Sequence, residues 1–506
     1  MVHRGQEPAC PPSSQSSRLP SKKNSACILD SLQQLWAECF PAFSQDRLAF
    51  RAQALSLSSL LCLGRHTITG LLTTCGQEFH DWSADYRLFS RHRLPLPPIF
   101  SVIRRDVLAQ LPPDAPLCVA IDDTLLRKTG IRIPGVAWRR DPLGPKFQTN
   151  FVRAQRFLQL SANIDLPGQI HRMIPIAFQH APTLPKPSAK ASKEQLSAYR
   201  KAAHAVRLSL LAAQQIRALR KSMDQEAGSS ARWLHVFGDG GQTNSTVLKD
   251  LPPRTVFTGR IRKDAALYFL PPETTSRQRV GRPRRYGAPA PTPEALRTDE
   301  SLPWQSISIA IDGTLHTMRV KVLPNLLWRA AGLRHTLQLV VVAPLGYRLR
   351  KGSKMLYTKP AFLICTDPLL GLTALLQGYV HRWDIEVNFR EEKTLLGVGQ
   401  AQVRSRHSVE DVPALQVASY AMLLLATIHA SQASPNLASL PVPKWSASPT
   451  PPRLSTQRAI NQLRAEVWGQ ALGLPNIADF VSCTPPDAKP EKFLPHLPSA
   501  LLYATN

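Results

Sequence analysis

The chain has 506 residues, of which 43% are hydrophobic, enough for two or three domains with buried cores. It holds 62 Lys and Arg against 35 Asp and Glu, a formal net charge of +27, so we expect a polyanionic partner, with nucleic acid as the first candidate. The apolar runs are shorter than the roughly 20 residues that span a bilayer, which excludes a membrane protein.

The first 25 residues are rich in Ser, Pro and Lys, and we expect them to form a disordered tail. They lack the apolar core of a secretory signal, so we expect an intracellular protein. The eight cysteines show no CxxC pair or zinc-finger spacing, which indicates reduced thiols.

Residues 26–111 have helical periodicity. Basic residues stand at Arg87, Arg91 and Arg93. This segment is expected to be a small helical domain that either binds DNA ends or serves as a scaffold, because no helix-turn-helix signal is sharp.

Residues 112–242 are expected to form the first part of an α/β core. A buried strand at 117–123 ends in acids, two strands follow around Pro167-Gly168, a long helix covers 192–223, and a strand at 233–239 ends in Asp239. This order begins a ribonuclease-H-like mixed sheet with flanking helices, in which acids at neighbouring parallel strand ends converge.

Residues 243–350 are predicted to be a mostly β insertion, with strands around 255–261, 306–312, 315–323 and 335–345. Residues 351–430 return to the core, with a strand at 361–367 and a single helix at 369–396. A Pro- and Ser-rich linker and a tail whose role is unreadable make up residues 431–506.

The predicted helix at 369–396 carries Tyr379, Arg382, Glu386 and Lys393 at offsets of zero, three, seven and fourteen. On a regular helix these positions lie within an arc of roughly 60°. The plain interpretation is a solvated face on which Glu386 pairs with its basic neighbours. The functional one is a carboxylate for a metal, surrounded by groups that hold phosphates.

This spacing resembles the Y-R-E-K signature of bacterial insertion-sequence transposases with a DDE catalytic triad. The resemblance implies a metal-dependent DNA nuclease and strand transferase, with two aspartates upstream of Glu386. The candidates are Asp239, in GDGGQTN, and one residue of the Asp122-Asp123 doublet, in IDDTLLRKTG. Neighbouring strand residues point to opposite sides, and we favour Asp123, directly before Thr124, as the metal ligand.

The three acids would bind Mg²⁺ or Mn²⁺, as two ions about 3.5–4 Å apart. Tyr379, Arg382 and Lys393 would hold the DNA end, while Trp383 either stacks on a base or packs in the ordinary way. Further candidate phosphate contacts, each of which has plain surface charge as its alternative, are Lys128, Arg260, Arg262 and Lys263, with Arg282, Arg284 and Arg285 in a basic loop.

The resemblance implies cleavage at terminal inverted repeats and joining of the ends to target DNA by two paired protomers, in a cytoplasmic, nucleoid-associated bacterial protein. Whether a hairpin intermediate forms stays open. Two alternatives are a metal-dependent nuclease without strand transfer and a domesticated protein that only binds DNA. The three acids argue against the second alternative.

Overall fold

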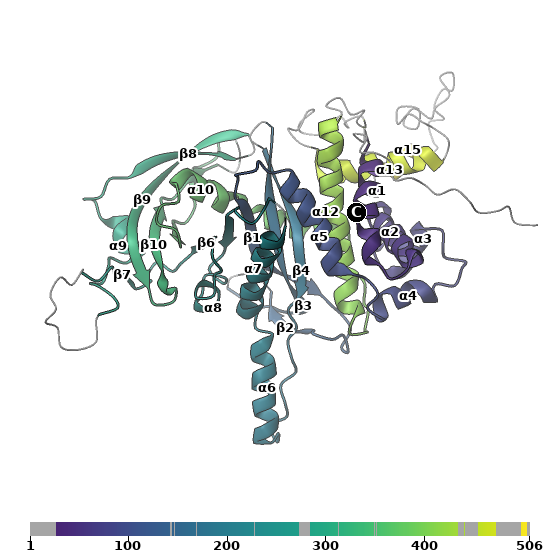
Figure 1. The fold of residues 1–506 in the computed structure, drawn as a ribbon, viewed down its shortest axis with the longest axis horizontal. Coiled ribbons are helices and arrows are strands. Elements are labelled where there is room, and N and C mark those ends of the chain that lie inside the picture. The colour runs from purple at the N-terminus through teal and green to yellow at the C-terminus, as the bar shows by residue number, and fades with distance from the viewer. Residues whose placement is uncertain are drawn as a thin grey trace, which may run out of the picture.

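The structure is a computed structural model (Figure 1). It describes residues 27–141, 144–145, 147–167, 170–226, 228–272, 284–311, 313–348, 350, 352–433, 440, 454–471 and 497–502. The predicted tail at 1–25 and most of the predicted linker and tail at 431–506 lie outside the described residues.

The N-terminal helical prediction is confirmed, because five α-helices and one short 3₁₀ helix fill the segment. They are α1 (Ile28–Cys39), η1 (Phe40–Ala42), α2 (Asp46–Leu61), α3 (Ile68–Thr74), α4 (Ser83–Ser90) and α5 (Leu96–Ala109). Helices α1, α2 and α5 pack against the long helix α12 (Ser408–Ala433). The segment therefore shares one hydrophobic core with the rest of the chain.

The centre of the molecule is an eleven-stranded sheet whose first strands have the ribonuclease-H-like arrangement. Strand β1 pairs antiparallel with β3, and β3 with β4, while β5 and then β6 run parallel to β1. Their bounds are β1 (Leu117–Arg127), β2 (Ala137–Arg140), β3 (Phe151–Leu166), β4 (Ile170–His180), β5 (Leu234–Gly238) and β6 (Thr255–Arg260). The core sheet thus continues past residue 242, because β6 belongs to it.

Two elements differ from the prediction in this region. Strand β1 does not end at the acidic doublet but runs on to Arg127. The predicted single helix at 192–223 is two helices, α6 (Lys193–Ala205) and α7 (Leu208–Gln225). Helix α7 packs on the sheet, whereas α6 buries no residue and projects away from the body of the molecule (Figure 1).

The predicted β insertion extends the central sheet. Strand β13 joins β6 to β10, so the order continues β6-β13-β10-β9-β7, with β8 beside β9. The elements are α8 (Ser245–Leu248), β7 (Leu267–Phe269), α9 (Pro293–Thr298), β8 (Gln305–Ile311), β9 (Thr314–Trp328), β10 (Gly332–Val342), β11 (Gly346–Tyr347), β12 (Leu356–Tyr357) and β13 (Ala361–Cys365).

The single helix predicted at 369–396 is also two helices, α10 (Leu372–His381) and α11 (Asp384–Thr394). Between them the backbone tightens to hydrogen bonds that span three residues. The N–H of Trp383 donates to the carbonyl of Val380 at 3.1 Å, and the N–H of Glu386 to that of Trp383 at 2.9 Å. The regular helix assumed for the four signature residues is therefore interrupted between Arg382 and Glu386.

Helix α12 is apolar all round because it is surrounded by protein. It is long and apolar enough to cross a bilayer, but 94% of that apolar stretch is buried, as in a core helix. Helix α13 (Thr456–Ala471) packs beside it and contacts α15 (Leu497–Leu502). The Glu466 carboxylate of α13 accepts the backbone N–H groups of Ile28 and Leu29, at 3.3 and 2.8 Å, and so caps α1.

Candidate active site

Two aspartates meet where the parallel strands β1 and β5 separate. The last parallel pair joins Ile121 to Gly238. Asp122 is the next residue of β1, and Asp239 directly follows the end of β5. The two carboxylates are close enough for the charge of Asp239 to raise the pKa of Asp122.

The turn after β5 fixes the Asp239 carboxylate. Its Oδ1 accepts the backbone N–H groups of Gly241 at 2.8 Å and Gln242 at 3.1 Å. The Thr243 hydroxyl donates to the Asp239 carbonyl at 2.7 Å. The predicted Gly-rich motif therefore serves to orient this carboxylate at the sheet edge.

Arg382, at the junction of α10 and α11, links the strand acids to Glu386. Its Nη1 lies 3.6 Å from Asp122 Oδ2, and its Nη2 lies 3.9 Å from Glu386 Oε1. The guanidinium carbon is 5.5 Å from the centre of the Tyr379 ring. The Arg382 side chain is only 9% exposed, so it is a built-in counter-charge rather than a free surface cation.

The charges of the acids shift one another's pKa values. Burial, followed by the charge of Asp239, raises the pKa of Asp122 to about 7. Burial also raises the pKa of Glu386, where the Asp239 charge adds to the effect and Arg382 opposes it. Asp239 is therefore close enough to act on both other acids.

The doublet is divided between the two faces of the sheet. Asp122 pairs with Gln159 of β3, whose amide donates to Glu392 of α11 at 2.9 Å, so this face is the one that α11 covers. Asp123 points to the other face, where its Oδ2 lies 3.1 Å from Arg156 Nε. Burial raises the pKa of Asp123, Arg156 opposes this, and the charge of Asp239 adds to the increase, as it does for Asp122. The register thus places Asp122, and not the favoured Asp123, on the face of Glu386.

The other predicted residues on α10 and α11 differ in their surroundings. Tyr379 is partly buried, and burial raises the pKa of its hydroxyl. The Trp383 side chain is 59% exposed, so ordinary packing does not explain it. Lys393 lies over the Phe389 ring at 5.9 Å, and burial lowers its pKa, with the charge of Arg127 contributing. Lys393 thus lies toward the far end of β1.

Lys128 is not the surface charge of the plain interpretation, and its ammonium group already donates to carbonyls of the protein, which does not favour a phosphate contact. Only 6% of it is exposed. Its Nζ donates to the carbonyls of Gly399 at 2.8 Å and Ala401 at 2.7 Å, and burial lowers its pKa to about 8. Its ammonium ties β1 to the segment that follows α11.

The predicted basic residues farther along the chain are mostly exposed. Arg260 ends β6, next to β5, and its charge lowers the pKa of Tyr379 against the larger effect of burial. Arg262 pairs with Asp264 at 2.9 Å. Lys263, Arg284 and Arg285 are exposed, and Arg282 lies outside the described residues.

Sequence reasoning missed a histidine contact behind the turn that carries Arg382. The rings of His171 and His381 stack with their centres 3.6 Å apart. His171 Nε2 also lies 3.1 Å from Asp384 Oδ2. These contacts anchor the turn to β4. No local pattern predicts them, because His171 is far from α10 in the sequence.

The acids fit divalent cations by their chemistry, because carboxylate oxygens are the ligands that Mg²⁺ and Mn²⁺ prefer. Burial is the main cause of the raised pKa of Asp122, and the Asp239 charge adds to it; a bound cation would offset that charge. Within the described part of the chain, however, no three acidic, His or Cys side chains form a ready-made metal centre. Arg382 instead occupies the space between Asp122 and Glu386.

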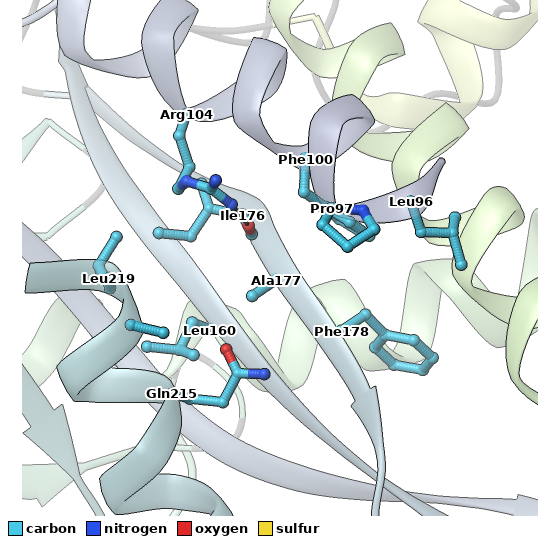
Figure 2. A pocket seen from close by; sticks show the side chains of 11 residues that line it. Leu96, Pro97, Phe100, Arg104, Leu160, Ile176, Ala177, Phe178, Gln215 and Leu219 are labelled. Atoms are coloured by element: carbon cyan, nitrogen blue, oxygen red, sulfur yellow. Dashed lines mark hydrogen bonds between the residues drawn. The ribbon is translucent and has the colours of Figure 1, made fainter. Parts of the chain in front are cut away.

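An apolar pocket of about 270 Å³ lies on the opposite face of the sheet (Figure 2). Helices α5 and α7 form its walls and β3 and β4 its floor, with Phe100, Leu160 and Leu219 among the lining residues. Leu160 pairs with Ile121, whose side chain points away from that of Asp122. The pocket therefore lies on the face opposite Asp122, which is the face of Asp123, and none of the candidate acids lines it.

Comparison with known proteins identifies one family. The family described as DDE superfamily endonuclease matches residues 37–322, more than half of the chain. The matched segment contains Asp122, Asp123 and Asp239 and ends before Glu386. No curated protein matches the chain. With its ribonuclease-H-like sheet and its acids at the strand ends, the chain belongs to the DDE superfamily endonuclease family.

Proposed function

We propose that the protein is an insertion-sequence transposase that cuts the terminal inverted repeats of a mobile element and joins the freed ends to target DNA. The observation that supports this proposal is that the buried Arg382 lies between Asp122 and Glu386, and that the charge of Asp239 acts on both of these acids. The Y-R-E-K spacing, which family membership alone does not require, supports transposition in particular.

In this proposal Asp122, Asp239 and Glu386 hold Mg²⁺ or Mn²⁺, as two ions. Bound divalent ions activate the attacking oxygen and stabilise charge on the leaving oxygen. Asp123, preferred on sequence grounds, is the alternative first ligand. Its position beside Arg156 favours a supporting role, in which it holds that arginine in place.

The neighbouring side chains would position the DNA. Arg382 and Tyr379 lie next to the acids and would contact the phosphate at the cut. Trp383 is exposed enough to stack on a base of the DNA end. Lys393, toward the far end of β1, and Arg260, at the end of β6, would contact more distant phosphates. The exposed cations Arg262, Lys263, Arg284 and Arg285 would track the phosphate backbone.

We further infer that two protomers pair the element ends and that the protein works in the cytoplasm on nucleoid DNA. The net charge of +27 supports a DNA partner. A metal-dependent nuclease without strand transfer is the second candidate, because the same acids and the same family would serve it. The two candidate functions differ in whether the protein joins the cut ends to target DNA.

The test compares wild type with Asp239→Asn and Glu386→Gln, two variants that keep side-chain volume. Labelled DNA carrying the inverted repeats that flank the gene is incubated with Mg²⁺ and a target plasmid, and cut and joined products are separated on gels. We expect wild type to give both products, and each variant to bind DNA without cutting it. Cutting by either variant would refute the site, and cutting without joining would select the nuclease.

A further inference from the structure

An exposed surface of mixed aromatic and basic residues lies on the ribbon formed by β2 and the start of β3. We call Trp138, Arg140, Phe151 and Arg153 the ribbon surface. Trp138 is 69% exposed and Phe151 is 56% exposed, and Arg140 is exposed as well. Large aromatic rings left this open contribute little to the core, so their packing does not account for them.

The strand register pairs each aromatic residue of this surface with an arginine. Trp138 lies opposite Arg153, and Arg140 lies opposite Phe151. The guanidinium carbon of Arg153 is 5.8 Å from the centre of the Trp138 ring. Its Nη1 and Nη2 donate to the carbonyls of Thr129 and Gly130, at 3.3 and 3.1 Å, so this arginine is already held in place. The result is two flat rings beside two arginines, of which Arg153 is held in place.

The ribbon surface lies on the same face of the sheet as the candidate active site. Phe151, Arg153 and Gln159 are an even number of positions apart on β3, so their side chains point to the same side of the sheet. Gln159 is the register partner of Asp122, which places Asp122 on that side as well. Six residues separate Arg153 from Gln159, on the order of 20 Å along an extended strand. That length corresponds to about six nucleotides of one DNA strand.

We propose that the ribbon surface binds unpaired bases of the DNA strand about six nucleotides from the cut. Aromatic faces accept any base by stacking, and neighbouring arginines neutralise the phosphates between the bases. A strand of unpaired nucleotides is the partner that needs both features, because a closed duplex hides its base faces. This inference rests on the proposed function, since it adds a DNA contact to the same active site.

The experiment measures binding by fluorescence anisotropy without divalent metal. The probes are a single-stranded oligonucleotide and a duplex of equal length. The test variant is Trp138→Ala combined with Phe151→Ala, and Trp138→Phe tests whether another ring restores binding. Trp233→Ala is the matched control, because Trp233 is 48% exposed but stands directly before β5, at the end of that strand opposite Asp239. Thermal melting checks that every variant is folded.

We expect the double variant to bind the single strand at least tenfold more weakly than wild type, since stacking on each ring contributes about 1–3 kcal/mol, a factor of five or more. The affinity for the duplex should fall less, and both Trp138→Phe and the Trp233 control should stay near wild type. Equal losses in the double variant and the control, or no loss in either, would overturn the inference.

A cleavage assay on the same proteins separates this inference from the proposed function. Cleavage by wild type, together with unchanged single-strand affinity of the double variant, would leave the transposase proposal standing and remove the ribbon surface from it. If the double variant selectively loses single-strand affinity but the wild-type protein never cuts DNA, the ribbon surface stands as a binding site and the transposase proposal falls. A wild-type protein that binds neither probe would overturn both.

Discussion

The guanidinium of Arg382 lies 3.6 Å from the carboxylate of Asp122, where both side chains are largely withdrawn from solvent. The same guanidinium reaches Glu386 at 3.9 Å. Arg382 therefore supplies positive charge to the oxygens that a metal ion would bind. Metal and arginine would compete for these carboxylates, and DNA phosphates would draw the arginine away from them.

Arg382→Ala is expected to have opposite effects on metal binding and on cleavage. Without the competing guanidinium, the DNA-free variant should bind Mn²⁺ several-fold more tightly than wild type, as measured by titration calorimetry. Cleavage should nevertheless fall by about 10²–10³-fold, because a charged donor aimed at the reacting phosphate is lost. Weaker Mn²⁺ binding by the variant would show that Arg382 organises the metal ligands and does not compete with the ion.

The two members of the doublet should differ in their effect on cleavage. Asp122→Asn is expected to abolish cleavage and to weaken Mn²⁺ binding, because Asp122 shares the face of Glu386 and the edge with Asp239. Asp123→Asn should retain measurable cleavage at saturating metal, because Asp123 pairs with Arg156 on the other face. The reverse result would restore the interpretation favoured by the sequence.

Cleavage should depend on pH through Asp122. Burial and the Asp239 charge raise the pKa of Asp122 to about 7, and only the ionised carboxylate binds metal well. At limiting Mg²⁺ the cleavage rate should therefore rise as the pH increases from about 6 to 8. Higher Mg²⁺ should shift the midpoint to lower pH, since the ion favours the ionised form. A midpoint near pH 4 at low Mg²⁺ would contradict this assignment.

Lys128→Met should lower stability and leave DNA affinity unchanged. The substitution keeps the aliphatic chain but leaves the carbonyls of Gly399 and Ala401 without their donor, at an expected cost of about 1–3 kcal/mol. Thermal melting measures the first effect, and the salt dependence of DNA binding measures the second. A lower salt dependence would return Lys128 to the DNA contacts.

Glu392→Gln should stabilise the protein at pH 8 and have little effect near pH 4.5. Burial raises the pKa of Glu392 from 4.5 to about 8, so the folded state holds a proton that the unfolded state releases. The contribution of Glu392 to the free energy of unfolding is fully present below pH 4.5 and is lost as the pH rises to about 8. The glutamine keeps an oxygen for Gln159, and at about 1.4 kcal/mol per pKa unit we expect a gain of a few kcal/mol at pH 8. Equal melting temperatures of wild type and variant at pH 8 would contradict this.

The sequence was sufficient to predict what depends on local pattern. Apolar runs ending in acids placed Asp122, Asp123 and Asp239 on neighbouring strands, and the strand, hairpin, helix and strand order predicted the core sheet. Features that depend on contacts between residues far apart in the sequence could not be predicted. The face of each doublet member depends on the pairing with β3, and the burial of Lys128 depends on carbonyls more than 270 positions away.

Helical pattern alone also concealed two boundaries. The break at Arg382 and Trp383 lies between Tyr379 and Leu396, a stretch without Gly or Pro, and the nearest glycine, Gly378, lies inside α10. The contacts of Arg382 with Asp122 and of His171 with Asp384 join residues that are far apart in the sequence. The regular apolar faces of the N-terminal helices led to the prediction of a small separate domain. In the structure, α12 covers the faces of α1, α2 and α5.

The dependence of α1, α2 and α5 on α12 and α13 has a consequence for synthesis of the protein. While the ribosome is still translating the catalytic sheet, the N-terminal helices have emerged without the apolar helix that covers them, and α1 lacks its Glu466 cap. Nascent chains shorter than about 430 residues should therefore recruit holdase chaperones. Cooperative folding of the whole chain should begin only after α13 has left the exit tunnel.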